Sequence, residues 1–422
     1  MSKKVINYQK VNEKVMYATV DIGKSKNFGY YRCSDGHEIK PFEFDNDTPG
    51  FNKFRNKIFF DSIKYQIDRI IIGFESTGNY GVPFVHYIDS EKDNFLVKNV
   101  DIVQTNPAHT KKIKDLRDNS PNKTDKKDPK VIADIIQMGC YLSVVIPKGA
   151  AANLRTLTNT RESEIKNRTV LINRLEKLVF EVFPEHSKIF KSIDGKTSFY
   201  ILEKYTLPGS LRRLGLKRLT TTIRRISRGR CKEEHAEKLI AAAKNPAGIH
   251  EGVQFKVIQI RRIICKIRDI DSYLEIIKTD MEKQLEVIPV SKHILSMKGI
   301  GIITTSYIIG QLGDIEAFTS QKALIKFAGL NLYEISSGKH FGQKHISKRG
   351  RPLIRKILYF AALGTVKKNG IMHDYYRRLV DRGMKKPKAL VAVSRKLLRI
   401  MNALVRDKTD YIHNYSLLKS AA

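Results

Sequence analysis

Four acidic residues in the first third of the chain have the types and positions expected of a metal-dependent phosphoryl-transfer site. They are Asp21, Glu75, Asp125 and Asp128. The first two each end an apolar segment, and the last two stand three positions apart before an expected helix. Carboxylates at the ends of buried strands are costly unless something compensates them, and several together repel one another and need a cation. Each acid alone is explained by a cap or a turn, but the four together favour a metal site.

Mg²⁺ is the cation that suits these acids. It is a hard ion that prefers oxygen ligands and keeps waters for a substrate phosphate. Two such ions can hold the attacking and the leaving oxygen of an in-line displacement. Asp128 precedes Pro129. Because a residue before proline avoids the helical region and proline suits the first helical position, we predict that Asp128 is the N-cap of the helix.

The charge balance of the chain predicts a polyanionic partner. Its 77 Lys and Arg against 43 Asp and Glu leave a net charge of +34, in a protein that is 41% hydrophobic. Such a charge destabilises a fold by self-repulsion unless a polyanion offsets it. Nucleic acid fits best, and its binding should weaken steeply with salt as counterions are released. A membrane surface or general solubility is the alternative use of the charge.

The cysteines and the apolar runs restrict the class of protein further. Cys33, Cys140, Cys231 and Cys265 are far apart and form no C-x-x-C pair, which argues against structural zinc and a disulfide framework. The first residues are not followed by the apolar core of a signal peptide, and no apolar run approaches the length of a membrane span. We therefore expect a cytoplasmic protein that associates with the nucleoid when it is bound to DNA.

The segment up to about residue 148 must position the acids, and it alternates strand and helix signals. Strands are expected at 16–21, 30–33, 39–44, 69–75 and 100–104, and helices at 51–65, 83–90 and 129–138. Three early strands followed by alternating helices and strands are typical of an α/β domain. The two acids at 21 and 75 then lie at strand ends.

Two long helices are expected next, and both carry an apolar seam. The first spans about 150–185, with seam residues Leu154, Leu157, Leu171, Leu175, Leu178 and Val182 and interruptions at Arg161, Glu164 and Arg168. The second steps by three and four through Ile260, Ile263, Ile267, Ile270, Leu274, Ile277 and Met281. This periodicity predicts a coiled coil. It does not name the partner, because the helices can pair with each other or join two copies of the chain.

A basic block lies between these helices, within a segment of about 190–250. From 204 to 232 there are ten Lys or Arg and no Asp or Glu. The block includes the pairs Arg212-Arg213, Lys217-Arg218 and Arg224-Arg225. Solvated helix faces normally mix both signs. Because all charges of the block are positive, contact with nucleic-acid phosphates is favoured over a solvated helix face.

The remainder, from about 289 to 422, is expected to be a helical domain, with helices at about 352–367, 372–381 and 387–405. Lys298, Gly299 and Gly301 precede an apolar helix. Glycines at a helix start can expose backbone amides to a phosphate, but an ordinary tight turn explains them equally well. Further along, Ser336-Ser337-Gly338 has the chemistry of an exposed turn.

The acids and several C-terminal segments stand in strings that resemble a known transposase family. The N-terminal strings are TVDIGK at 19–24, FESTGNY at 74–80 and NKTDKKD at 122–128. The C-terminal strings are SMKGIG at 296–301, FAGL at 327–330, SSG at 336–338, ISKRG at 346–350 and LIR at 353–355. They resemble the D-E-D-D motifs and the second transposase domain of the insertion-sequence one-ten and one-eleven-eleven family. Their joint order makes the resemblance specific.

The resemblance implies a fold, a chemistry and a set of partners. Residues 1–148 would form a RuvC-like domain with a ribonuclease-H fold, whose acids Asp21, Glu75, Asp125 and Asp128 bind Mg²⁺. Residues 149–288 would form a coiled-coil region with the basic insert, and residues 289–422 a helical transposase domain with Ser337 as the nucleophile. The family also implies donor and target DNA, a noncoding bridge RNA, and dimers that assemble into a tetramer. Two features depart from the family, which are Pro129 and the length of the segment at about 190–250.

Ser337 has neighbours that suit an attack on a DNA phosphate. A hydroxyl is a weak nucleophile until a base or a metal eases its deprotonation. The only carboxylate nearby in sequence is Glu334, so the metal would come from the first domain. Cations that could hold phosphate oxygens follow at Lys344, Lys348, Arg349, Arg351 and Arg355. Two other functions remain open: a structure-specific nuclease that uses water with the same acids, and a non-catalytic nucleic-acid-binding protein.

Overall fold

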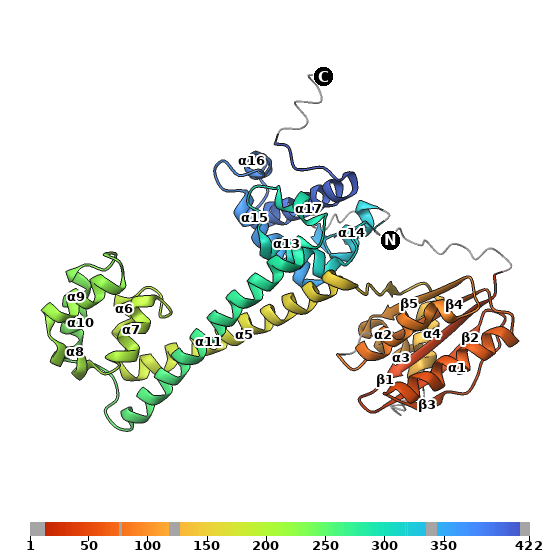
Figure 1. Cartoon of the computed structure of the whole chain (residues 1–422), viewed down its shortest axis with the longest axis horizontal. Coiled ribbons are helices and arrows are strands. Elements are labelled where there is room, and N and C mark those ends of the chain that lie inside the picture. Colours follow the sequence, from red (N-terminus) through yellow and green to blue (C-terminus); the bar gives the residue numbers. More distant parts are fainter. Residues whose placement is uncertain are drawn as a thin grey trace, which may run out of the picture. The chain divides into compact units, whose positions relative to one another are not determined.

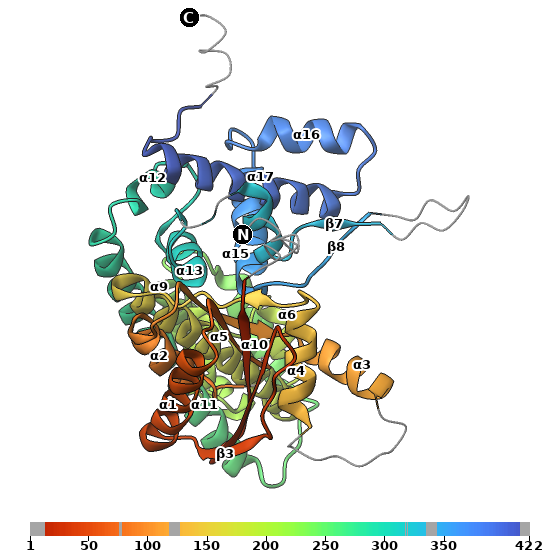
Figure 2. The same ribbon diagram turned by 90° about the vertical axis from the view of Figure 1, so that its right-hand side faces the viewer.

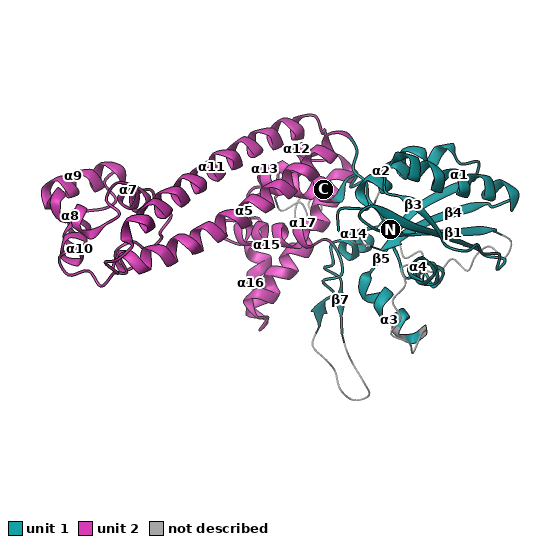
Figure 3. Ribbon diagram, turned by 90° about the horizontal axis from the view of Figure 1, so that it is seen from below, with its two compact units in different colours: residues 1–148, 312–350 teal, residues 149–311, 351–422 magenta. Residues whose placement is uncertain are grey.

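The computed structural model of the chain describes residues 13–75, 78–117, 127–316, 318, 320–334 and 344–413. The chain divides into two compact units, shown in different colours in Figure 3. Unit 1 comprises residues 1–148 and 312–350, and unit 2 comprises residues 149–311 and 351–422. The three domains expected from the sequence stay a prediction. The two compact units are not the same division, because each of them combines two separate segments of the chain.

Unit 1 is built on a six-stranded sheet with the order β3-β2-β1-β4-β5-β6. The strands are β1 (Val15–Ile22), β2 (Lys26–Cys33), β3 (Phe42–Asp45), β4 (Arg69–Glu75), β5 (Asn99–Thr105) and β6 (Leu142–Ser143). β4 lies parallel to both β1 and β5, whereas β2 pairs antiparallel with β1 and β3, and β6 with β5. The central β4 is an almost continuous apolar run because both faces of the sheet are covered.

Helices cover the two faces of this sheet (Figure 2). On one face α1 (Thr48–Lys64) and α2 (Val82–Glu91), followed by the short η1 (Lys92–Asn94), enclose every second residue of β1, namely Met16, Ala18, Val20 and Ile22. On the other face α4 (Asp128–Gln137) packs Ile132 and Ile136 against Tyr17 and Ile71, and α3 (Pro107–Arg117) contacts α4. Residues of β1 alternate between the two faces because successive side chains of an extended strand point to opposite sides.

Most predicted elements of unit 1 are confirmed, and two details are wrong for local reasons. The strand expected at 39–44 begins only at Phe42, because Pro41 has no N–H to offer a neighbouring strand. Asp128 is the first residue of α4 and Lys127 is the N-cap, whose carbonyl accepts from the Val131 N–H at 3.3 Å. Pro129 therefore lies in the first turn of α4, where its missing N–H removes no helical hydrogen bond. The elements α3 and β6 were not predicted from the sequence.

Unit 2 is organised around two helices of 34 residues each, α5 (Gly149–Val182) and α11 (Val253–Glu286), which run antiparallel (Figure 1). Apolar residues of both predicted seams pack together within the chain, among them Leu175, Leu178, Val182, Ile260, Ile263 and Ile267. Of the two alternatives left open by the periodicity, pairing within one chain is therefore observed. A supercoil, and a further pairing between copies, stay predictions.

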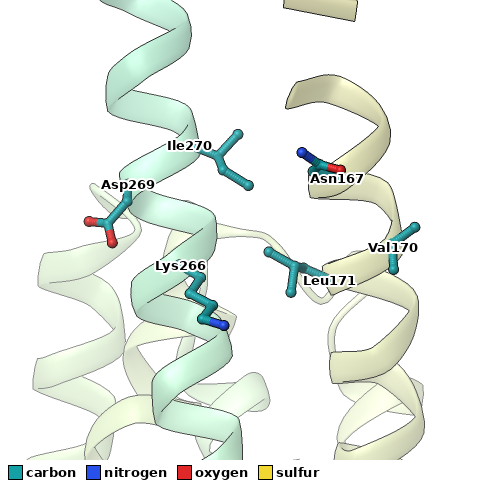
Figure 4. A pocket seen from close by; sticks show the side chains of 6 residues that line it. All are labelled: Asn167, Val170, Leu171, Lys266, Asp269 and Ile270. Carbon is teal, nitrogen blue, oxygen red and sulfur yellow. The ribbon is translucent and has the colours of Figure 1, made fainter. Parts of the chain in front are cut away.

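One charged interruption of the first seam has partners of opposite sign. Arg168 Nε lies 2.6 Å from Asp271 Oδ1 on α11, and Arg168 Nη1 lies 3.1 Å from Asp194 Oδ2. Near this ion pair the two helices flank a hollow of about 480 Å³, toward which Leu171 and Ile270 point (Figure 4). These two residues belong to the predicted seams, but here they border an opening instead of closing it.

A bundle of five short helices, here called the helical cap, lies at one end of the α5–α11 pair (Figure 1). It consists of α6 (His186–Ile189), α7 (Lys196–Lys204), α8 (Pro208–Leu214), α9 (Leu216–Ile226) and α10 (Glu233–Lys244). Its core includes Ile201, Leu211, Leu219, Ile223 and Leu239. The basic block is therefore part of a folded bundle with its own apolar interior.

A second bundle in unit 2 anchors the other end of α5. Its helices are α12 (Ser291–Leu295), α13 (Ile302–Leu312), α15 (Pro352–Thr365), α16 (His373–Asp381) and α17 (Lys386–Asp407). Glu162 of α5 is buried and accepts hydrogen bonds from Lys356 Nζ at 2.5 Å and from Tyr307 Oη at 3.5 Å. A buried carboxylate requires such partners, so Glu162 fixes the position of α5 along α13 and α15.

The remaining elements, α14 (Gln321–Phe327), β7 (Leu332–Tyr333) and β8 (His345–Ile346), belong to unit 1. β7 and β8 form a two-stranded antiparallel ladder of their own. None of the described helices combines the length and the apolar character that a membrane crossing requires.

Candidate metal and nucleic-acid sites

Asp21 and Glu75 occupy neighbouring positions at the carboxyl ends of two parallel strands. The register pairs Val20 of β1 with Phe74 of β4, so the next residues along the strands are the two acids. Val20 and Phe74 belong to the core on the α1–α2 face, so their successors point to the face that α4 covers. Both acids are partly exposed. Open α/β sheets bind their ligands at the carboxyl ends of strands, so this corner is a candidate site.

Asp128 is brought to the same corner by α4. Thr19, two positions before Asp21 on the same face of β1, donates a buried hydrogen bond of 2.7 Å from Oγ1 to the Pro129 carbonyl. Gly73 permits this approach, because a Cβ at that position would lie 2.0 Å from Ile136 Cδ1. The start of α4 is therefore held at the end of β1. Asp128 Oδ2 lies 2.6 Å from Lys114 Nζ of α3.

The donor set of this corner fits a divalent cation in kind. Its three carboxylates offer only oxygen ligands, which Mg²⁺ prefers, and the Lys114 ammonium already supplies positive charge to Asp128. Within the described residues, no three Asp, Glu, His or Cys side chains are grouped closely enough to hold a metal ion by themselves. Asp125, the fourth predicted acid, lies outside the described residues. Asp21, Glu75 and Asp128 thus stand around one corner of unit 1, but they do not form a metal-binding cluster there.

Replacing Thr19 by valine should destabilise this corner. Valine keeps the shape of the side chain but removes the donor to the buried Pro129 carbonyl, which costs about 1–3 kcal/mol of unfolding free energy. We expect the melting temperature to fall by several degrees, at about 2–4 °C per kcal/mol, as measured by circular dichroism. Thr19→Ser retains the hydroxyl and is the matched control. Equal melting temperatures for Thr19→Val and the unsubstituted protein would show that the hydrogen bond does not hold α4.

Ser337, the predicted nucleophile, lies outside the described residues, in the segment of sequence between β7 and β8. Beside it in sequence, Lys344 Nζ lies 3.8 Å from Glu334 Oε2, across the β7–β8 pair. Lys348 and Arg349 follow β8, and both are exposed. The predicted cations of unit 1 therefore stand on the strand pair whose connecting segment contains Ser337, where they are accessible to a phosphate.

Arg351 and Arg355, at the start of α15 in unit 2, are less exposed than these cations. Burial lowers the pKa of both guanidinium groups. Arg155 of α5 lies close to Arg351, and burial, then the positive charge of Arg351, lowers its pKa to about 10. Its guanidinium donates to the carbonyls of Gly310 at 3.0 Å and Gln311 at 3.1 Å. Sequence reasoning missed Arg155, because no local signal marks a residue whose partners are 155 positions away.

The segment at 298–301 forms the turn between α12 and α13. Lys298, Gly299 and Gly301 are all exposed, and Gly299 has a φ of +93°, which favours glycine. The Gly301 carbonyl accepts from the Thr305 N–H at 3.0 Å, so the turn leads directly into α13. Both a phosphate clamp and an ordinary tight turn fit this geometry, and the clamp stays a prediction.

The basic block lies on the surface of the helical cap, where all ten of its Lys and Arg side chains are exposed. Arg212 and Arg213 lie in the last turn of α8. Lys217, Arg218, Arg224 and Arg225 belong to α9. The structure thus brings the six predicted residues of the block together on two consecutive helices.

Two family models match the chain in the order in which these sites occur. A DEDD transposase model of the IS110 type matches residues 18–184, and a model described as "Transposase IS116/IS110/IS902 family" matches residues 291–377. Together they cover more than half of the chain. The chain belongs to the IS110 family of transposases.

Curated relatives of this transposase come from insertion elements. The 44.8 kDa protein of IS116 from Streptomyces clavuligerus is 29% identical, over 68% of this chain and 72% of its own length. The 43.6 kDa protein of IS110 from Streptomyces coelicolor is 21% identical, over 94% and 95%. The 42 kDa protein of IS900 from Mycobacterium paratuberculosis is 25% identical, over 68% and 73%. A solved Ppx/GppA family member from Aquifex aeolicus aligns with a TM-score of 0.18 and 10% identity, over 62% of this transposase and 98% of that chain, which is too weak to carry an argument.

Membership of the family fixes the function at a coarse level. Transposases cut and rejoin DNA, so DNA is the substrate. DEDD domains imply a ribonuclease-H-like fold, which agrees with the mixed α/β sheet of unit 1, and they are typically dependent on divalent metal. The first model spans the four acids and the second spans Ser337, whereas neither reaches residues 185–290 of this transposase.

Proposed function

We propose that this transposase cuts and rejoins DNA through a covalent phosphoserine intermediate, at a composite site of Ser337 and four acids. The observation that supports the proposal is that Asp21 and Glu75 end neighbouring parallel strands, and that α4, which begins at Asp128, packs at the same corner. In a DNA-cutting family, acids at strand ends serve as ligands of divalent cations, and an all-oxygen donor set favours Mg²⁺. Asp125 would supply the fourth carboxylate.

The chemistry exchanges one phosphodiester for another. Bound Mg²⁺ would stabilise the charge that develops on the phosphoryl group and ease deprotonation of the hydroxyl. Ser337 Oγ attacks the phosphorus, the bond to one strand oxygen breaks, and that oxygen leaves as a hydroxyl with a proton. In the rejoining step a strand-end hydroxyl attacks the phosphoserine and restores both the DNA and the serine. Because a diester is kept throughout, rejoining needs no nucleotide cofactor.

Cations that lie close to Ser337 in the sequence would hold the phosphate during both steps. Lys344, Lys348 and Arg349 are exposed on and beside the β7–β8 pair. Hydrogen bonds from ammonium and guanidinium groups to phosphate oxygens are charge-assisted and therefore strong. Arg351 and Arg355 continue this run of cations into α15, and the turn at 298–301 would contact a further phosphate.

The partners that we propose are two DNA duplexes, a noncoding bridge RNA and further copies of the chain. The net charge of +34 supports polyanionic partners. Glu75 and Ser337 are far apart in the sequence, so the acids and the serine must meet either within one chain or between copies. We infer that dimers join into a tetramer, in which the acids of one copy serve the serine of another.

Trapping the covalent intermediate tests this proposal. Full-length protein is incubated with Mg²⁺, labelled duplexes that carry the ends of its element, and RNA transcribed from the element, and is then denatured. We expect a labelled protein–DNA adduct that proteinase releases, that EDTA prevents, and that mass spectrometry assigns to a phosphoserine. Cleavage without an adduct would mean that water is the nucleophile. Binding without any cleavage would mean a non-catalytic binding protein, and either result overturns the proposal.

A further inference from the structure

The helical cap is a folded module for which the chemistry proposed above has no use. Its helices α6 to α10 lie in residues 186–244, outside both matched family regions, which end at 184 and resume at 291. Ile201, Leu211, Leu219, Ile223 and Leu239 form its apolar core. The cap is thus a bundle with its own core at one end of a pair of 34-residue helices.

Helix α9 separates an apolar face from a cationic one. Leu219 and Ile223, four positions apart, are buried in the cap. Lys217, Arg218, Arg224 and Arg225 are exposed. The two cationic pairs stand seven positions apart, which is two helical turns or about 10 Å along the axis. α9 therefore presents a pair of cations near each end of its exposed face.

The preceding helix extends this cationic surface. Gly215 alone joins α8 to α9, with a φ of +74° that suits glycine. The last turn of α8 contributes Arg212 and Arg213, both exposed. After α9, the exposed Arg228, Arg230 and Lys232 complete the block before α10 begins. The α8–α9 surface thus carries cations on two consecutive helices and the loop behind them.

The cations of the block form no ion pairs with the acids of the cap. Across the described part of the chain, none of the ten cations in the block forms an ion pair with a carboxylate, and the block itself contains no Asp or Glu. Two cations outside the block do form ion pairs with acids of the cap. Arg268 of α11 lies 2.8 Å from Glu203, and Lys238 of α10 lies 2.5 Å from Glu234. A dense surface of one sign repels itself and is offset by an external polyanion.

The shape and composition of this surface favour duplex DNA over other nucleic acids. Single strands are bound by stacking on exposed aromatic rings, and no aromatic residue is among the exposed large hydrophobic residues of the cap. The major groove of B-DNA, about 12 Å wide, admits an α-helix, whereas the major groove of A-form RNA is too narrow for side chains to read. With α9 lying across such a groove, cations about 10 Å apart along its axis can reach phosphates on both sides.

We propose that the α8–α9 surface is a duplex-DNA docking site that adds affinity through phosphate contacts. Phosphate contacts fix the position of a protein on a duplex and carry no direct sequence information. The cap would therefore strengthen the hold on DNA without choosing the sequence to be cut. The proposal is independent of the serine chemistry, because a protein that forms no adduct can still pass the test below.

The test compares two full-length variants with equal charge removal. The first carries Lys217→Gln, Arg218→Gln, Arg224→Gln and Arg225→Gln on α9. The control carries Lys188→Gln, Lys191→Gln, Lys238→Gln and Lys244→Gln elsewhere on the cap, where all four are exposed. Binding to labelled duplex DNA, duplex RNA and single-stranded DNA of one length is measured by fluorescence anisotropy over a range of salt concentrations. Melting temperatures confirm that both variants fold.

The α9 variant should lose duplex-DNA affinity by about 10- to 100-fold at low salt. Its slope of log K against log salt should fall by up to about 3.6, since each of the four lost phosphate contacts removes roughly 0.9. The control should keep a slope within about 1 of the unsubstituted protein. An unchanged slope for the α9 variant, or an equal loss in the control, would overturn the proposal. A greater loss on duplex RNA or on single strands than on duplex DNA would overturn the choice of DNA.

Discussion

Asp21→Asn and Glu75→Gln should each abolish DNA cleavage while leaving DNA binding intact. The amides keep the size of the side chains but remove a negative charge from the corner where β1 and β4 end. Catalytic metal ions contribute several kcal/mol to phosphoryl transfer, so the rate of strand cleavage should fall by about 10³-fold. The duplex-DNA dissociation constant should stay within about two-fold, because neither acid belongs to the cationic surfaces.

The matched control for these two variants is Asp45→Asn. Asp45 is exposed and ends β3, which lies two strands away from β1 and runs in the same direction. Asp45 and Asp21 therefore lie at the same ends of their strands. Its substitution should leave cleavage within about two-fold of the unsubstituted rate. Raising the Mg²⁺ concentration should partly restore Glu75→Gln, because a weakened site fills at higher metal concentration. If Asp21→Asn still cleaved at more than about a tenth of the normal rate, Asp21 could not be a metal ligand.

Ser337→Ala should eliminate both the protein–DNA adduct and recombination, whereas Ser336→Ala should retain them. Removing a nucleophile typically lowers the rate by 10⁴-fold or more, on the order of other serine enzymes. Alanine differs from serine only by the hydroxyl, so binding of DNA should not change. The measurements are denaturing gels for the adduct and a junction-specific amplification for recombination.

The adjacent serine makes this comparison specific. Both substitutions remove one hydroxyl from the same Ser-Ser-Gly string, so a general effect on local structure would alter both proteins. Loss of the adduct in Ser336→Ala alone would move the nucleophile by one position. Undiminished recombination by Ser337→Ala would show that neither the assignment nor the covalent mechanism holds.

The elements with strong local patterns could be predicted from the sequence. β4 spans Arg69–Glu75 as expected, because a strand buried on both faces is a continuous apolar run. α5 and α11 were expected because their apolar residues recur at helical spacing. α3 was missed, since PAHTKKIKDLR is mostly polar and Leu116 is 82% exposed. Hydrophobic patterns in the sequence therefore located the elements that bury an apolar face, but not those that bury few apolar residues.

The candidate site was only partly predictable, because its geometry depends on contacts between distant segments. The types and positions of Asp21 and Glu75 were visible, but their adjacency depends on the register of Val20 with Phe74. The partner of Asp128, Lys114, lies on the helix that the sequence did not predict. Thr19 was overlooked because its role is a hydrogen bond to Pro129, 110 positions along the chain.

The buried Glu162 sets how far α5 extends from the second bundle of unit 2. Sliding α5 by one turn would separate its carboxylate from Lys356 and Tyr307, and an uncompensated buried charge costs about 3–5 kcal/mol. From Glu162 to Val182, where α5 ends, 20 residues at 1.5 Å per residue give a reach of about 30 Å. On B-DNA this reach corresponds to about nine base pairs, at 3.4 Å each. Deleting one heptad from both α5 and α11 removes about 10 Å of helix, so a duplex that contacts both the helical cap and the second bundle should have a footprint shorter by about three base pairs.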